Sequence, residues 1–192
     1  MRPVPAATQT TRSLSPFSVL GHGPVRALVA SAVLEGGAVL RFDYALDNRP
    51  GQIRVPSRRP PGQTDELWKH TCFEAFIAPA TGGGDEYREL NFSPSTQWAA
   101  YSFTSYRKGI APVALDSAPR IEVVETRSRL TVQARVGTQG LFPESWRAPG
   151  LKLRIALSAV IEDDSGNISY WALRHAPDKP DFHHPAGFIL EV

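Results

Sequence analysis

The sequence of 192 residues contains one cysteine, one methionine and no long apolar run. The single cysteine, Cys72, cannot form a disulfide within the chain or supply a zinc site built on two or more cysteines. Its apolar, strand-like surroundings favour a small buried residue over a nucleophile. Residues 1 to 16 lack the apolar core of a signal peptide, and no segment has the length of a membrane helix. We therefore expect a cytoplasmic protein with no membrane partner.

The chain also lacks a strong charge of either sign. Its 21 Lys and Arg residues are interspersed with 19 Asp and Glu residues, which leaves a net charge of +2. The densest basic spot combines Arg54 with Arg58 and Arg59 in a Pro-rich loop without aromatic residues, which is typical of a solvated loop. A nucleic-acid partner is therefore not expected. Motifs of a nucleophilic serine or a phosphate-binding loop are missing too, so the sequence favours a protein that is not an enzyme.

Short strand-like segments separated by Gly, Pro, Asn and Asp turns make up most of the chain, and no window shows sustained helical periodicity. This pattern predicts an all-β protein, an antiparallel β-sandwich of the jelly-roll type. Residues 1–15 are expected to form a flexible arm, and residues 16–192 a single domain. The Pro-rich residues 48–64 are expected to form a long loop. The predicted strands cover residues 39–46, 71–78, 87–92, 97–104, 121–125, 130–136, 151–161 and 168–173.

One candidate site begins where this loop enters a strand. In an extended chain, Trp68, His70 and Glu74 would share one face. Trp68 is either one wall of a sugar-stacking site or a lid on the core. Glu74 lies among apolar residues, so it must be paired or hydrogen-bonded. It either forms a structural pair with a basic group such as Arg88 or accepts hydrogen bonds from ligand hydroxyl groups.

Other candidates lie further along the chain. Asn91 either serves a ligand or caps the following turn. The segment from Trp171 to His184 combines aromatic, basic and acidic residues around rigid proline turns. His183 and its neighbour His184 diverge in an extended chain, and no two-His helical spacing exists, so no metal site is expected.

Three strings in these regions resemble the bacterial DOMON-like proteins, a group similar to the family-nine carbohydrate-binding modules. The strings are residues 67–76 (LWKHTCFEAF), residues 89–95 with 98–101 (ELNFSPS and WAAY), and residues 179–185 (KPDFHHP). The resemblance covers most of residues 17–192. It implies a β-sandwich with a ligand site at one side of the sheets, where related domains bind either sugars or haem.

In the sugar-binding relatives two aromatic residues clamp a terminal sugar. Carried over by position, Trp68 is one wall and Phe182 the other, with Trp171 as the alternative. A Phe in place of a Trp implies a weaker clamp. In haem-binding relatives the axial ligand is commonly Met, but the only methionine here is Met1. Haem would then need ligands such as His70, His183 or Lys179.

The leading hypothesis is a non-catalytic module that binds a small polar ligand, a sugar or sugar derivative. Trp68 and Phe182 would stack on the ligand. The hydrogen-bonding groups would be His70, Glu74, Asn91 and His183. One alternative is a haem or metal protein that uses His and Lys ligands. The other is an enzyme that acts on a small glycoside through Glu74 and a histidine. The sequence selects no oligomeric state.

Overall fold

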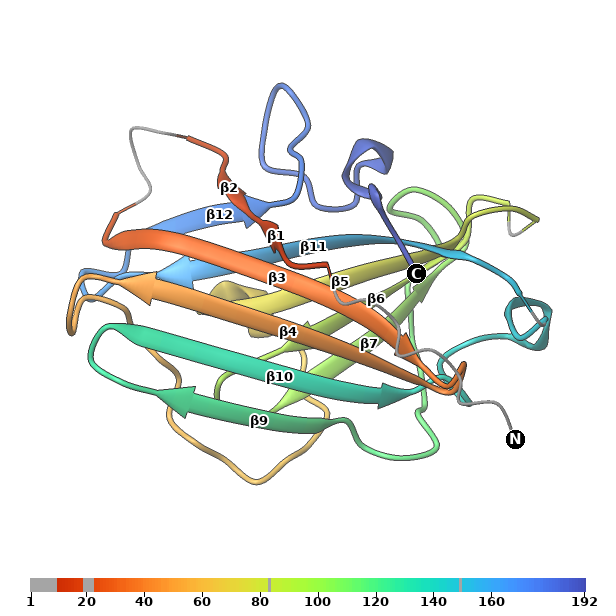
Figure 1. The fold of residues 1–192 in the computed structure, drawn as a ribbon, viewed down its shortest axis with the longest axis horizontal. Coiled ribbons are helices and arrows are strands. Elements are labelled where there is room, and N and C mark those ends of the chain that lie inside the picture. The colour runs from red at the N-terminus through yellow and green to blue at the C-terminus, as the bar shows by residue number, and fades with distance from the viewer. Residues whose placement is uncertain (1–9, 19–22, 83, 149) are drawn as a thin grey trace.

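The computed structural model describes residues 10–18, 23–82, 84–148 and 150–192. Its strands form two antiparallel sheets that face each other across one apolar core (Figure 1). The predicted all-β antiparallel sandwich is therefore confirmed. Within the described ranges, no helix is long and apolar enough to cross a membrane.

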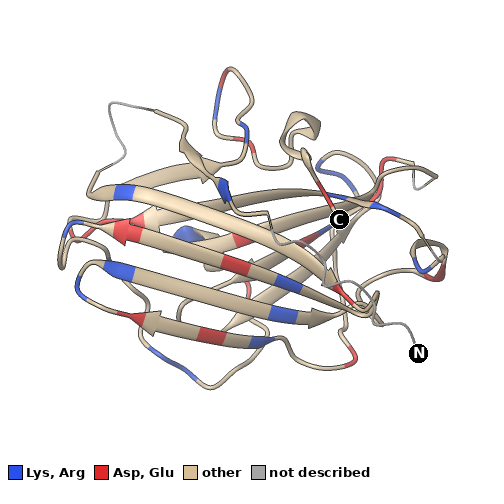
Figure 2. Ribbon diagram, in the orientation of Figure 1, with Lys and Arg blue, Asp and Glu red and all other residues tan. Residues whose placement is uncertain are grey.

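The first sheet has five strands and one solvent-exposed face. In spatial order they are β1 (Arg12–Ser13), β3 (Val25–Glu35), β4 (Val39–Asn48), β10 (Arg129–Gly137) and β9 (Arg120–Glu125). Along β4, buried Leu40, Phe42 and Leu46 alternate with partly exposed residues, as expected for a strand with one face on the core. Figure 2 shows charged residues along β4, β10 and β9.

The second sheet has eight strands and is covered on both faces. In spatial order these are β2 (Ser15–Pro16), β12 (Ile168–Ala172), β11 (Leu153–Glu162), β5 (Cys72–Pro79), β6 (Tyr87–Phe92), β7 (Trp98–Phe103) and β8 (Ala111–Pro112), with β13 (Leu190–Glu191) pairing with β11. All residues of β5 are buried. This confirms the prediction of a central strand and of a buried Cys72.

A second apolar cluster lies on the outer face of this sheet. It contains Phe76, Tyr87 and Phe103, and Leu67 and Phe182 from loops pack against it. The 3-10 helices η1 (Leu67–Lys69) and η3 (Pro185–Gly187) belong to these covering loops, whereas η2 (Glu144–Trp146) contributes Trp146 to the core between the sheets. The outer face is thus shielded by loops rather than by a third layer of strands.

Two features of the sandwich differ from the sequence-based expectation. The strand β3 is absent from the predicted set because its burial pattern does not alternate regularly, and a register shift follows Val25. The last residues of the expected flexible arm belong to the sandwich. Arg12 and Ser13 pair with β3, and Leu14 is buried in the core. Two-residue strands carry no periodicity from which they could be recognised. Residues 1–9 of that arm lie outside the described residues.

Candidate functional site

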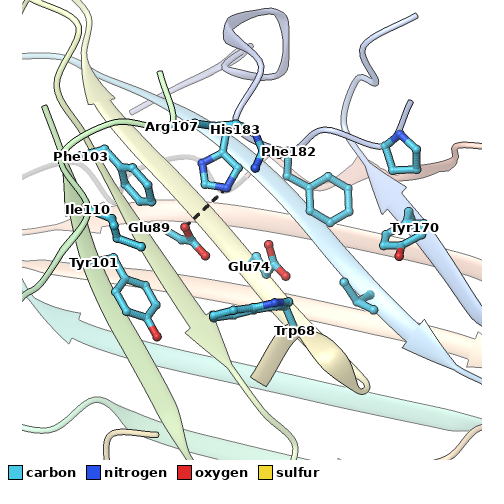
Figure 3. Close-up of a pocket in the computed structure, with 12 residues that line it drawn as sticks. Trp68, Glu74, Glu89, Tyr101, Phe103, Arg107, Ile110, Tyr170, Phe182 and His183 are labelled. Atoms are coloured by element: carbon cyan, nitrogen blue, oxygen red, sulfur yellow. Dashed lines mark ion pairs between the residues drawn. The ribbon is translucent and has the colours of Figure 1, made fainter. Parts of the chain in front are cut away.

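A cavity of about 430 Å³ lies over the outer face of the eight-stranded sheet, bordered by the loop between β12 and η3 (Figure 3). We call it the aromatic pocket. Its aromatic lining residues are Trp68, Tyr101, Phe103, Tyr170 and Phe182. The remaining lining residues are Glu74, Glu89, Arg107, His183, Ile110, Val160 and Pro180. The pocket therefore combines flat apolar walls with acidic and basic groups.

The two carboxyl groups are placed by the register of neighbouring strands. Glu74 on β5 pairs with Asn91 on β6, and Phe76 pairs with Glu89. Because directly paired residues point to the same face, Glu74 and Glu89 are diagonal neighbours on the outer face. Glu89 also pairs with Tyr101 on β7, which carries the row of site residues onto a third strand.

Both carboxyl groups are buried, and burial changes their acidity. Burial raises the pKa of Glu74 well above its usual range, and the neighbouring charge of Glu89 raises it further. Burial also raises the pKa of Glu89 to about 7, although a hydrogen bond from Asn91 and the positive charge of Arg107 lower it. At neutral pH the pair therefore keeps at least part of its protons, and the floor of the pocket carries less charge than two free carboxylates.

Two buried side-chain oxygens in this region lack a hydrogen-bond partner among the described residues. They are Glu74 Oε1, from a residue that lines the pocket, and Asn91 Oδ1, from a residue that lies beneath the lining. The amide of Asn91 is oriented by its other side, because Nδ2 donates to Glu89 Oε1 at 2.8 Å. The pair with Arg88, one of the two alternatives considered for Glu74, does not form, since that guanidinium lies on the opposite face and donates to the carbonyl of Leu141. Unpartnered buried acceptors are costly, and a ligand that donates hydrogen bonds would satisfy them.

Trp68 reaches the pocket from the short helix η1. Glu66 precedes this helix with a positive φ of 62°, and His70 N closes the turn by donating to the carbonyl of Leu67. The turn interrupts the extended chain, so residues 68, 70 and 74 do not share one face as predicted. The Trp68 side chain is 39% exposed and meets Tyr101 edge to face, with 6.2 Å between ring centroids.

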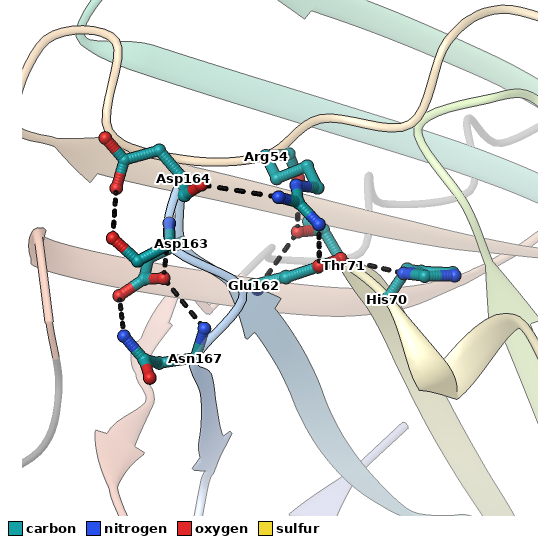
Figure 4. A network of polar contacts seen from close by, with 8 residues as sticks. Arg54, His70, Thr71, Glu162, Asp163, Asp164 and Asn167 are labelled. Atoms are coloured by element: carbon teal, nitrogen blue, oxygen red, sulfur yellow. Dashed lines mark hydrogen bonds and ion pairs between the residues drawn. The ribbon is translucent and has the colours of Figure 1, made fainter.

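His70 points away from the aromatic pocket into a polar network (Figure 4). Its Nδ1 lies 2.8 Å from Glu162 Oε2, and Arg54 Nη1 lies 2.6 Å from Glu162 Oε1. Thr71 Oγ1 donates to the carbonyl of Arg54 and accepts from the backbone N–H of Glu162. The predicted role of His70 beside Trp68 is thus corrected: His70 anchors the chain after the turn and lines a separate cavity.

The opposite wall is held by one buried carboxylate. Asp181 accepts hydrogen bonds from the hydroxyl of Tyr106, from Arg107 Nη2 at 2.7 Å and from the backbone N–H of His183 at 3.2 Å. Burial alone would raise the pKa of Asp181, but the hydrogen bonds from Tyr106 and Arg107 and the charge of Arg107 lower it below its ordinary value. These contacts fix the segment that contains Phe182.

Phe182 and His183 follow directly from this anchor. Figure 3 shows Trp68 and Phe182 on opposite sides of Glu74. His183 Nδ1 is hydrogen-bonded to the hydroxyl of Tyr87 at 2.9 Å, and its Nε2 lies 3.8 Å from Glu89 Oε2. Burial and, as a smaller effect, the charge of Arg107 together lower the pKa of His183 to about 4. The charge of Asp181 opposes this shift. The imidazole is therefore neutral near pH 7.

Two predicted residues lie elsewhere. Trp171 is paired with Ala159 on the inner face of the sheet, and its ring belongs to the core between the sheets. Its neighbour Tyr170 points to the outer face and lines the pocket instead. Lys179 is exposed and does not line the pocket. The sequence shows an aromatic residue near this wall, but strand register decides which of two adjacent rings faces the cavity.

Several pocket residues were missed. Glu89 and Tyr101 could have been found, because both lie on the same face as Glu74 once the strands are registered. The same register argument applies to Phe103, which follows Tyr101 by two residues on β7. On the same strand, Trp98 points into the core between the sheets, whereas Tyr101 lines the pocket. Arg107 and Ile110 could not be predicted as members of the site, since they come from a turn and a loop that carry no recognisable signal.

Metal and haem ligation have little geometric basis in the described residues. That part of the chain contains no group of three or more His, Cys, Asp or Glu residues placed to hold a metal ion. The predicted haem ligands do not line a common cavity. His183 lines the aromatic pocket, His70 lines the polar cavity, and Lys179 lines neither.

No family model matches the chain, and no curated protein matches it by sequence. Solved structures with a similar fold do exist. A Bacteroides uniformis protein to which carbohydrate binding is ascribed aligns with a TM-score of 0.67 and 12% identity, over 94% of this chain and 84% of the other. A family 9 carbohydrate-binding module from Caldicellulosiruptor kristjanssonii, in complex with cellotriose, aligns with a TM-score of 0.52 and 9% identity, over 94% of this chain and 80% of the other. At these identities the likeness concerns the fold.

Proposed function

We propose that this protein binds a small saccharide in the aromatic pocket without transforming it. The observation that carries the proposal is the placement of Trp68 and Phe182 on opposite sides of the buried Glu74 (Figure 3). Two flat rings can stack on the two apolar faces of a sugar ring, while polar groups at the floor meet its hydroxyl groups.

The floor supplies the hydrogen-bonding part of this site. Glu74 Oε1 is a buried acceptor without a partner among the described residues, and Glu89 is the diagonal neighbour of Glu74 on the next strand. Hydroxyl groups of a sugar both donate and accept, so they suit carboxyl groups that keep part of their protons. Asn91 does not line the pocket. Its amide donates a hydrogen bond to Glu89 and so orients that carboxyl group.

The structural neighbours support a saccharide as the ligand class. One of them is a family 9 carbohydrate-binding module in complex with cellotriose, and its fold matches most of this chain. The cavity of about 430 Å³ is at the small end of the range for ligand sites, which favours a short saccharide over a long chain.

Isothermal titration calorimetry with a panel of mono- and disaccharides tests the proposal. Trp68→Ala is expected to abolish binding while the melting temperature changes little, because the side chain is 39% exposed. The control Val124→Ala removes an exposed apolar side chain from β9 in the other sheet and is expected to leave binding unchanged. Saccharide binding that survives Trp68→Ala would contradict the stacking role.

The carboxyl pair favours a second candidate function, glycoside hydrolysis. A pKa of about 7 would allow Glu89 to donate a proton to a leaving group near neutral pH, and Glu74 would be the second carboxyl group. Release of nitrophenol from nitrophenyl glycosides would reveal such turnover. In that case Glu89→Gln is expected to remove turnover while saccharide binding persists, and a wild-type protein without turnover refutes this candidate.

A further inference from the structure

The floor of the aromatic pocket offers acceptors for hydrogen bonds and few free donors. Glu74 is 3% exposed and its Oε1 accepts no hydrogen bond from the described residues. Asn91 lies beneath the lining residues, and its donor Nδ2 is already bound to Glu89, so its amide supplies no donor to the pocket. A ligand group placed against this floor therefore has to donate hydrogen bonds.

The positively charged residue at the wall does not neutralise the floor completely. Arg107 donates through both Nε and Nη2 to Asp181 Oδ1, so its charge is paired with a different carboxylate. His183 is hydrogen-bonded to Tyr87 and is uncharged near neutral pH. When Glu74 and Glu89 are both ionised, no further cation among the lining residues is available to balance them.

The walls add a second attraction for positive charge. Trp68, Tyr101 and Tyr170 come from three different segments, and with Phe103 and Phe182 they surround the space above the two carboxyl groups. The faces of aromatic rings attract cations, and this attraction grows when water is excluded. Carboxylates beneath an aromatic enclosure form an arrangement suited to an ammonium group, which carries three donors and one positive charge.

We propose that the preferred ligand is a saccharide that carries a protonated amine, with the ammonium group placed between Glu74 and Glu89. This inference rests on the proposed saccharide binding and defines its chemical class. A hydroxyl group at the same position would satisfy the acceptors but would not balance the charge of the pair. An N-acetylated amine keeps one hydrogen-bond donor and loses the charge. Comparing it with the free amine therefore separates the contribution of hydrogen bonding from that of charge.

The proposal implies that binding depends on pH. The raised pKa values of Glu74 and Glu89 mean that the free pair holds protons below neutral pH. An ammonium group favours the ionised forms, so its binding releases protons and strengthens as the pH rises from about 5.5 to about 7, while the amine of the sugar is still protonated. The titratable or charged groups that interact with the pair are Tyr44, Cys72, Tyr87, Tyr101, Arg107 and His183.

Calorimetry with glucosamine, glucose and N-acetylglucosamine tests the inference on the full chain. We expect glucosamine to bind about tenfold more tightly than either neutral sugar near pH 7, where its amine is still mostly protonated. The preference should shrink near pH 5.5, and buffers with different ionisation enthalpies should reveal proton release. Glucose or N-acetylglucosamine that binds as tightly as glucosamine overturns the inference but leaves saccharide binding intact. If none of the sugars in the wider panel binds, both proposals fail.

Matched acid-to-amide variants identify the source of the preference. Glu74→Gln and Glu89→Gln keep the side-chain size and remove one charge each, so both are expected to lose the preference for glucosamine. Glu122→Gln makes the same change on an exposed position of β9, in the other sheet, and is expected to retain it. Thermal denaturation confirms that each variant is folded. A folded Glu74→Gln protein that still prefers glucosamine overturns the inference, and Glu89→Gln gives the same test should Glu74→Gln fail to fold.

Discussion

Replacing Glu89 by Gln is expected to change how the free energy of unfolding depends on pH. Glu89 is buried, and its pKa is raised in the folded protein from 4.5 to about 7. The folded protein therefore holds the proton of this carboxyl group more tightly than the unfolded chain does. Such a group contributes stability below about pH 4.5, and that stability is lost as the pH rises through the folded pKa near 7.

The size of the effect follows from the two pKa values. One pKa unit corresponds to about 1.4 kcal/mol, so a rise from 4.5 to about 7 corresponds to roughly 3–4 kcal/mol once both states are ionised. Gln cannot ionise, but its side-chain oxygen can still accept the hydrogen bond from Asn91. Relative to the wild type, Glu89→Gln should thus be more stable by up to roughly 3–4 kcal/mol near pH 8 and close to equal near pH 4.

Urea unfolding monitored by tryptophan fluorescence measures this difference across the pH range. The matched control Glu122→Gln removes an exposed carboxyl group from β9 and should run parallel to the wild type. A Glu89→Gln curve that also runs parallel to the wild type would show that Glu89 titrates in the folded protein as it does in the unfolded chain. Such a result would refute the conclusion that burial raises the pKa of the carboxyl pair at the pocket floor.

Three further substitutions separate structural from binding roles. Trp171→Ala should destabilise the fold by about 3–5 kcal/mol in chemical denaturation, because its ring lies in the core, and a loss below 1 kcal/mol would contradict that placement. Glu162→Gln should weaken saccharide binding measured by calorimetry, because His70, which directly follows the turn that carries Trp68, and Arg54 lose their shared charged partner. Unchanged affinity would show that Glu162 does not position Trp68. Asp181→Asn should weaken binding and speed tryptic cleavage after the exposed Arg174 in the same loop, and resistance equal to that of the wild type would show that the loop does not depend on this carboxylate.

The fold could be predicted because strands with one or two buried faces leave a pattern in the sequence. Alternation in residues 39–46 and the apolar run at residues 71–78 correspond to β4 and β5. The strand β3 was missed because its burial does not follow a two-residue period. The short strands β1 and β2 depend on pairing with β3 and β12, and such long-range pairing leaves no local pattern.

The sequence pointed to part of the lining of the aromatic pocket. A glutamate among apolar residues indicated Glu74, and the resemblance to sugar-binding modules implied Trp68 and Phe182; all three line the pocket. The expected face shared by Trp68 and His70 was wrong, because it assumed an extended chain where the structure has a turn of 3-10 helix. Trp68 lies within this helix, whereas His70 at its end is already extended, so the two side chains point in different directions.

The aromatic pocket depends on the loops as much as on the sheet. Two carboxylates, Glu162 and Asp181, anchor the segments that carry its aromatic walls. Glu74 and Glu89 are fixed by strand pairing and would keep their places in any sandwich with this register. Trp68 and Phe182 are fixed differently, by polar contacts of Glu162 and of Asp181 with other loops. Loosening either anchor should therefore separate the aromatic walls without unfolding the sandwich. This division predicts that affinity is more sensitive than stability to changes at the anchors, whereas substitutions in the core should reduce both together.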